Sequence, residues 1–546
     1  MRMTALFPPR SRPISALSGD PTDRADRVAA WCLQGPLTFA LLTLAVVQIL
    51  AWLPQYLSWP WWADHDVFAT AALGWSQGLL PYRDLLGNNF PGSIYLFWLV
   101  GTVFGWGKTA PFYALDALLL LLMLEGLLIW SRRRFGSRLP GAVGVLAVLG
   151  YVLSLDYTQA AQRDSQAPML TILAIVSAET GGVVLGPVLG GLLAAAGWSI
   201  RPQTVLLWPA LALAIAQTAA RHSSPGKARK NVALSWLWGG LSLSVGLGLV
   251  MAPLAISGVL GDFLRSLRES TLGDSYYRTS VASFAAEMVR QLSMRDLVTV
   301  GASLLLIRQA PATIRQTATV WLVALGGVLL YRPLSPFPHA YLDHPRMLVS
   351  ALNLAVLAAM VREARPMTPS FRLASLLAVL ALGGVLRPVF ANPGASVREA
   401  PRVLAGKDPW IKPLGYRQNG LVMSAALYEW KDYRFALAYL QDHTEPTTRI
   451  ANVLGGVPAL CGPLGLLPVF PAESIAWLNV RPDQEAVFAR SLEAPGDSVV
   501  VWAPSEWGQA PEPGRPRLPS GLEPVIRRYY EPETSFGPIE IWRRTR

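Results

Sequence analysis

The sequence predicts a polytopic α-helical membrane protein, with about 11–13 transmembrane helices, that ends in a soluble α/β domain. Its 546 residues are 52% hydrophobic and only 15% charged, whereas soluble domains carry about a quarter charged residues. Apolar runs of membrane length recur from residue 37 to residue 388, and the remainder of the chain is hydrophilic. We therefore expect a membrane domain over 36–389 and a soluble domain over 390–546.

Eleven apolar stretches are candidate membrane spans. They are 37–57, 111–131, 139–156, 166–180, 182–198, 202–220, 232–256, 296–309, 316–331, 345–362 and 371–388. A further apolar stretch, 93–106, is ambiguous because it is short and lies close to the next candidate span.

Lysine and arginine gather in short segments, which in membrane proteins face the cytoplasm. These segments are 1–35, 131–138, 221–230, 308–315 and 362–372. They share one side only if a single crossing separates 58–92 from 131–138, so we interpret 93–106 as a half-span or an interfacial helix and 111–131 as that crossing. The alternative is that 93–106 and 111–131 are both full spans, in which case the basic segments would not all lie on the cytoplasmic side. The predicted protein lies in the inner (plasma) membrane, with its N-terminal segment, 1–35, in the cytoplasm.

The loops predicted to face outward carry most of the polar residues outside the C-terminal domain. The longer ones are 58–92, 157–165, 257–295 and 332–344. The formal net charge of +12 is attributed to the basic cytoplasmic loops, so nucleic acid is not expected as a partner. Cys32 and Cys461 are predicted on opposite sides of the membrane, so we do not expect a disulfide between them.

The C-terminal segment alternates between predicted strands and helices, which indicates a small α/β domain. Apolar, β-branched runs predict strands at 449–456, 498–504 and 539–544. Helical periodicity predicts helices at 433–443 and 483–493. No GxGxxG or P-loop motif appears, so the sequence gives no support for a nucleotide site here.

Two carboxylates, Asp64 and Asp66, directly follow the first span. On an extended segment, side chains two residues apart point the same way. Such a pair could supply a general base or hold a divalent cation through its oxygens. The alternative is a solvated loop that only caps the next helix.

Three further outward segments carry candidate binding residues. "QRDSQ" contains Arg163 and Asp164, and "GWSIRPQT" contains Arg201. A guanidinium suits a phosphate because its planar fork binds two oxygens. The alternatives are an ion pair between Arg163 and Asp164, a helix N-cap at Asp164, and snorkelling of Arg201.

The third segment, "SPFPHAYLDHP", contains His339, Tyr341, Asp343 and His344. The spacing of its histidines is a weak metal signal, and phosphate contact or loop packing is the preferred interpretation.

The stretch "DHDVFATAALGWSQGLLPYRD…FPG" resembles the first extracytoplasmic loop of polytopic glycosyltransferases with the GT-C fold. The branch it resembles contains the protein O-mannosyltransferases, the lipid A aminoarabinose transferase ArnT and the Rgt-type transferases. That branch carries an acidic residue after the first span, a G-x-x-P-Y-x-D element and a later proline, which here are Asp64, Gly78–Asp84 and Pro91. "RDSQAPMLTILAI", "GWSIRPQ" and "PFPHAYLDHP" resemble its later loops. This chain departs from the branch at "DHD", where "DE" is common.

The resemblance implies a glycosyltransferase that moves a hexosyl or pentosyl unit from a polyprenyl-phosphate carrier to a glycan, lipid or protein acceptor, with inversion. In that case Asp64 is the expected base, and Asp66 or Asp164 orients the acceptor or holds a cation. The expected substrate-binding residues are Arg163, Arg201, Tyr82, Asp84, His339 and His344. No cofactor is firmly implied, although a divalent cation held by Asp64 and Asp66 is left open.

Two other classes remain open. A transporter or flippase of a lipid-linked or anionic substrate would place charged groups near mid-span. A surface-polysaccharide ligase or polymerase would need a large outward loop with Arg and His, and 257–295 has no His.

Overall fold

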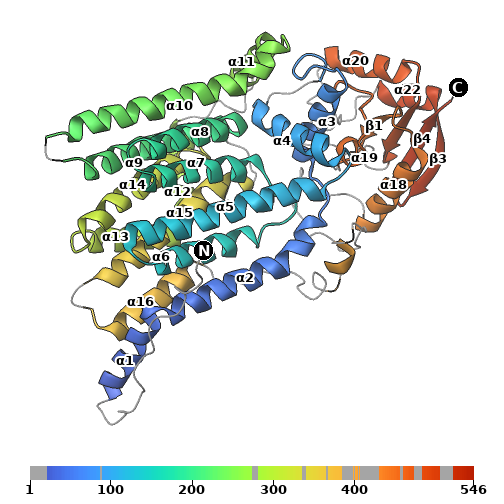
Figure 1. The fold of residues 1–546 in the computed structure, drawn as a ribbon. Helices are drawn as coiled ribbons and strands as arrows, with labels where there is room; N and C mark the ends of the chain where they lie inside the picture. Colours follow the sequence, from blue (N-terminus) through green and yellow to red (C-terminus); the bar gives the residue numbers. More distant parts are fainter. Residues whose placement is uncertain are drawn as a thin grey trace.

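The computed structural model confirms a helical membrane protein with a C-terminal α/β domain (Figure 1). It describes residues 21–545, except for 86–88, 225, 274–280, 335–339, 365–366, 384–397, 399, 404, 406–428, 455–458, 473–481 and 505–520. His339 and the middle of the loop 257–295 therefore lie outside the described residues.

Each of the eleven candidate spans coincides with a helix. The helices that match them are α2 (Pro36–Leu57), α5 (Ala110–Phe135), α6 (Leu139–Val152), α7 (Arg163–Thr180), α8 (Leu185–Ile200), η1 with α9 (Pro202–Leu207, Trp208–Arg221), α10 (Ala228–Ile256), α13 (Met294–Leu306), α14 (Ala312–Leu329), α15 (His344–Glu363) and α16 (Pro369–Leu382). Within the described residues, six helices are long and apolar enough to cross a membrane by themselves, and four further apolar helices are shorter. The total of 11–13 crossings stays a prediction.

The helices differ in how far they are enclosed. In α15, 89% of the most apolar 18-residue window is buried, against 22% in α2 and in α10. Helix α15 is therefore a central helix of the bundle. The exposed faces of α2 and α10 are rich in Leu, Val and Trp, as expected of surfaces in contact with lipid.

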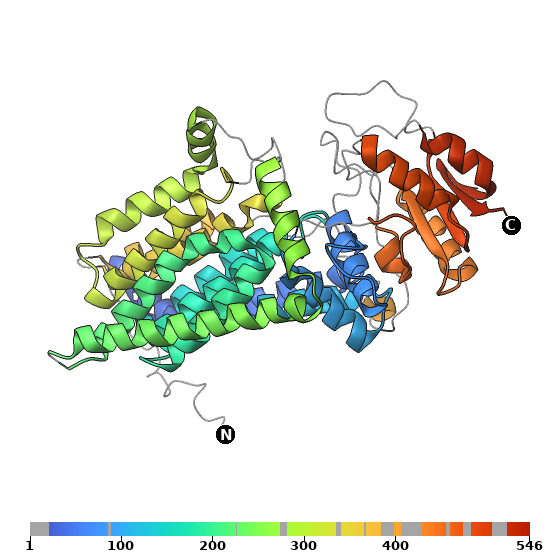
Figure 2. The same cartoon turned by 90° about the horizontal axis from the view of Figure 1, so that it is seen from above.

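The basic segments gather at one end of the bundle. In Figure 1 the turns that join α5 to α6, α9 to α10, α13 to α14 and α15 to α16 lie on the left, with α1 (Pro21–Gln34). The C-terminal domain lies at the opposite end in both views (Figure 2). This is the segregation of positive charge on which the predicted topology rests.

Two short helices lie between the bundle and the C-terminal domain (Figures 1 and 2). They are α3 (Ala63–Ser76) and α4 (Pro91–Phe104). With 14 residues, α4 is as long as α6 and α16, so its length does not separate it from the other short apolar helices. The interpretation of 93–106 as a half-span or interfacial helix stays a prediction.

The C-terminal domain is built on a four-stranded sheet of order β1-β2-β4-β3. Its strands are β1 (Arg449–Val453), β2 (Ser498–Trp502), β3 (Tyr530–Phe536) and β4 (Ile539–Arg544), and its helices are α18 (Trp430–His443), α19 (Cys461–Leu464), α20 (Pro482–Glu493) and α22 (Leu522–Tyr529). Strand β2 pairs parallel with β1 and antiparallel with β4. All five predicted elements of this domain are found; β3, α19 and α22 were not predicted.

One buried apolar cluster runs from the helical domain into the C-terminal domain. It contains Trp61 from the first loop and Phe97 from α4, together with Leu460, Cys461 and Ile541 from the C-terminal domain. The two domains therefore share a continuous core at the end of the bundle where the candidate site lies.

Candidate functional site

The Asp64–Asp66 segment is the first turn of helix α3, which corrects the expected extended conformation. Its start follows from local chemistry: Nδ1 of His65 accepts a hydrogen bond from the Trp62 backbone N–H at 3.2 Å. Acidic residues at the start of a helix are stabilised by its dipole. Side chains two residues apart on a helix point about 200° apart, so Asp64 and Asp66 lie on opposite sides of α3.

Asp64 is the carboxylate of this pair that faces the polar cluster of the membrane domain. It lies within electrostatic range of Tyr341, as do Arg163, Asp164 and Arg201. Its Oδ2 atom is buried and accepts no hydrogen bond from any described residue. A shielded carboxylate oxygen without a donor is available to accept a proton from a substrate.

Asp66 has the opposite environment. The side chain is 1% exposed and accepts hydrogen bonds from the backbone N–H groups of Leu460 at 2.8 Å and Gly462 at 2.5 Å. A cation shared by Asp64 and Asp66 does not fit this separation. Nor do the described residues contain any group of three His, Cys, Asp or Glu side chains that could hold a metal ion.

Asp164 organises the cationic part of the site from the first turn of α7. Its Oδ1 lies 2.9 Å from Arg201 Nε and accepts a hydrogen bond from the Tyr331 hydroxyl at 2.5 Å. Arg201 Nε also donates to the Tyr331 oxygen at 3.1 Å. Burial alone would lower the pKa of Arg201, but the charge of Asp164 outweighs it and raises that pKa above its usual value. Arg201 is therefore a fixed, permanently charged group.

Arg163 stands next to this pair and is held from three directions. Its Nε lies 3.8 Å from Asp164 Oδ2, and its guanidinium donates to the side-chain oxygen of Asn89. The guanidinium carbon lies 5.4 Å from the centre of the Phe68 ring, a cation–π distance. The predicted convergence of Asp64, Arg163, Asp164 and Arg201 is thus what the structure shows, although their roles stay predictions.

Tyr82 and Asp84 belong to a turn that is linked to the site by hydrogen bonds through Asn89. The Leu80 N–H donates to Asp84 Oδ2 at 2.7 Å, and Tyr82 adopts a left-handed backbone conformation with φ 68°. The Tyr82 hydroxyl donates to the Asn89 carbonyl at 2.8 Å. Since Asn89 accepts from Arg163, the turn acts on the site through Asn89.

His344 is enclosed in the helical domain. Its Nε2 donates to the Gln159 carbonyl at 2.8 Å, and its Nδ1 accepts from the Tyr151 hydroxyl at 2.5 Å. With Tyr56 and Asp116 it lines a small cavity. Both ring nitrogens therefore have partners, which leaves none for a phosphate in this conformation.

Sequence reasoning missed two members of the site, Tyr331 and Asn89. Tyr331 ends a span in "LLYRP", and Asn89 lies in "GNNFPG". A tyrosine at a span end is read as an interfacial anchor, and an asparagine before Phe-Pro as a turn. Neither pattern predicts a partner far away in the chain.

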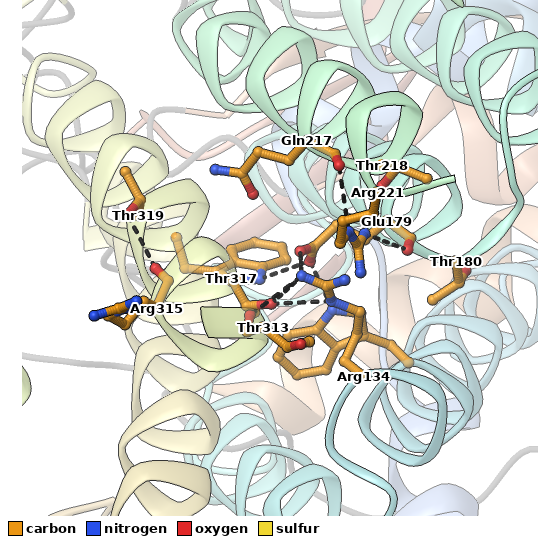
Figure 3. Close-up of polar contacts among 12 residues, drawn as sticks. Arg134, Glu179, Thr180, Gln217, Thr218, Arg221, Thr313, Arg315, Thr317 and Thr319 are labelled. Atoms are coloured by element: carbon orange, nitrogen blue, oxygen red, sulfur yellow. Dashed lines mark hydrogen bonds and ion pairs between the residues drawn. The ribbon is translucent and has the colours of Figure 1, made fainter. Parts of the chain in front are cut away.

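A second buried polar cluster lies at the other end of the bundle (Figure 3). Arg134 donates to Thr317 Oγ1 from Nη2 at 2.6 Å and lies 3.5 Å from Glu179. The indoles of Trp130 and Trp321 donate to Glu179 Oε2 at 2.6 and 3.3 Å. The cluster ties α5, α7 and α14 together, far from Asp64 along the bundle.

His65 gives a pH prediction that tests the start of α3. Burial lowers the pKa of His65 from 6.5 to about 4, although the Asp64 charge and the Ala161 carbonyl oppose this. The folded protein then binds fewer protons than the unfolded chain, so this residue removes stability as the pH falls from 6.5 towards 4. We expect the thermal unfolding midpoint of His65→Gln to fall less over this range than that of the unaltered protein. Equal slopes would contradict a buried, neutral His65.

Comparison with protein families and with curated proteins finds no match. Two solved structures of ArnT from Cupriavidus metallidurans are similar to this chain. The structure bound to undecaprenyl phosphate aligns with a TM-score of 0.40 and 10% identity, and the apo structure with 0.37 and 11%. Each alignment covers 93% of this chain and 98% of the other. At these scores, any chemistry has to be argued from the residues of the site.

Proposed function

We propose that this protein is a membrane glycosyltransferase that takes a sugar from a polyprenyl-phosphate carrier and passes it to an acceptor hydroxyl outside the cytoplasm. The observation that carries the proposal is the pairing of a base without a donor, Asp64, with two guanidiniums, Arg163 and Arg201, held by Asp164. The resemblance of "DHDVFATAALGWSQGLLPYRD" to GT-C first loops supports the same class.

The chemistry is a single displacement at the anomeric carbon. Asp64 accepts the proton of the acceptor hydroxyl as that oxygen attacks, and the bond to the phosphate oxygen breaks on the opposite face. The sugar is transferred to the acceptor oxygen with inverted anomeric configuration, and the polyprenyl phosphate is released. Arg163 and Arg201 stabilise the negative charge that develops on the departing phosphate. Base catalysis and positioning together supply much of the rate.

The position of the site suits a donor that is half lipid. The cluster lies at the end of the bundle that faces the C-terminal domain, where α7 begins and α8 ends. A polyprenyl chain would remain among apolar helix faces while its charged head reaches the guanidiniums. A water-borne acceptor would enter from the side of the C-terminal domain.

Purified protein in proteoliposomes, given a panel of radiolabelled polyprenyl-phosphate sugars and crude envelope acceptors, is expected to transfer label from at least one donor. A nucleotide sugar without the lipid is the matched control and should give no transfer. The anomeric configuration of the product should be inverted relative to the donor. Movement of the intact donor across the bilayer without transfer would instead identify a transporter and refute the proposal.

A further inference from the structure

The C-terminal domain contacts a buried carboxylate of the membrane domain, Asp66. Besides the two backbone N–H groups of Leu460 and Gly462, the Cys461 backbone N–H is a further donor to the Asp66 carboxylate. These three donors belong to the start of α19, where backbone N–H groups have no partner within the helix. A carboxylate of the first loop therefore satisfies the turn that begins α19.

The shape of the contact is as restrictive as its hydrogen bonds. A Cβ atom placed on Gly462 would lie 2.7 Å from Asp66 Oδ1, 2.8 Å from the Trp61 ring and 2.9 Å from the Ala69 side chain. On the far side of the turn, a Cβ atom on Gly465 would lie 3.3 Å from the backbone nitrogen of Gly107. Helix α19 thus fits closely between α3 and the chain that follows α4.

Asp66 shares the first turn of α3 with Asp64, on the opposite side. This turn is also held by a 3.2 Å hydrogen bond from His65 Nε2 to the Ala161 carbonyl and by packing of the His65 ring against Phe112. Whatever holds Asp66 therefore also fixes the distance of Asp64 from the guanidiniums. A misplacement of about 1 Å in a reacting group can cost about 10²-fold in rate.

We propose that Asp66 is a positioning residue through which the C-terminal domain holds the catalytic base Asp64 in place. The proposal rests on the proposed function and extends it, because it makes α19 a part of the active centre. Asp66 itself does no chemistry, since its oxygens are occupied by backbone N–H donors of α19. The C-terminal domain then controls turnover without contacting the sugar.

Burial raises the pKa of Asp66 from 3.8 to about 6, while the backbone N–H donors at the start of α19 lower it. The carboxylate is therefore charged at neutral pH and accepts all of these bonds. Experiments at neutral pH examine the contact in this state.

The test disturbs the contact from both sides. Asp66→Ala removes the acceptor, Asp66→Asn keeps one acceptor oxygen, and Gly462→Ala leaves Asp66 intact but adds a methyl group where there is no room. Gly240→Ala is the matched control, because a Cβ at this exposed position on α10 meets no atom within 4 Å. We expect Asp66→Ala and Gly462→Ala each to lower kcat by about 10–100-fold with a small change in KM for the donor. Asp66→Asn should fall between them and the unaltered protein.

Hydrogen exchange supplies a readout that does not depend on activity. Amides over 459–466 and over α3 should exchange faster in Asp66→Ala and Gly462→Ala than in Gly240→Ala, at an unchanged global unfolding midpoint. Unaltered kcat in both variants would overturn the proposal. So would a loss confined to Asp66→Ala, which would make Asp66 a chemical participant. If the unaltered protein transfers no sugar, the proposed function fails, and unchanged exchange in Gly462→Ala would separately refute the contact.

Discussion

Replacing Asp64 by asparagine is expected to lower kcat for sugar transfer by about 10²–10⁴-fold, the range that general base catalysis contributes. Asparagine has nearly the same shape as aspartate, but it cannot accept the proton of the acceptor hydroxyl. The change should leave folding intact, because Asp64 Oδ2 accepts no hydrogen bond from a described residue. Donor binding should also persist, since Arg163 and Arg201 are untouched.

The measurement compares transfer in proteoliposomes with binding of the labelled donor and with the thermal unfolding midpoint. Asp442→Asn is the matched control, because it makes the same chemical change at an exposed position of α18. Full activity in Asp64→Asn would remove the base assignment and leave Asp164 as the next carboxylate to examine. Loss of donor binding along with activity would show that Asp64 binds substrate and does not act as the base.

Much of the helical domain was predictable because apolar length and composition determine it. An apolar run as long as 37–57 predicts a transmembrane helix, and α2 covers almost the same residues. Helix α3 was not predicted because 63–76 mixes polar and small residues. Strand β3 was missed for a similar reason: Pro532 interrupts it, and an edge strand of this kind depends on pairing with β4.

The sequence predicted which charged residues gather at the candidate site, but it did not predict which partners each of them contacts. One topology places Asp64, Arg163, Asp164 and Arg201 on the same side, and the structure brings them together. The partner of each charge is a matter of tertiary packing. Asp66 meets Leu460 across 394 residues, and nothing in "DHD" distinguishes the carboxylate that is bonded from the one that is not.

The pair of Asp164 and Arg201 gives the largest expected effect on stability. Asp164 is fully buried, and Arg201 has a side-chain exposure of 12%. Breaking a buried pair on one side leaves an uncompensated charge, at a cost of about 3–5 kcal/mol. We expect Asp164→Ala to lower the free energy of unfolding by this amount and to abolish transfer, because Arg201 loses both its counter-charge and its orientation. Unfolding in detergent, followed by a thermal midpoint or a denaturant titration, measures the first effect.

The double variant Asp164→Ala/Arg201→Met decides whether the cost comes from the stranded guanidinium. Methionine fills much of the same space without charge, so the double variant should be more stable than Asp164→Ala while remaining inactive. Glu523→Ala is the control for an exposed pair: Glu523 lies 2.9 Å from Arg527 with both side chains about half exposed, and its loss should cost less than about 1 kcal/mol. If the second substitution lowered stability further, the ion pair would not be what holds Arg201. Recovery of stability without recovery of transfer would separate the structural role of Arg201 from its role in transfer. The fold does not need the guanidinium once Asp164 is removed, because no buried charge is then left unpaired. The departing phosphate still needs the guanidinium, because it stabilises the negative charge that develops there.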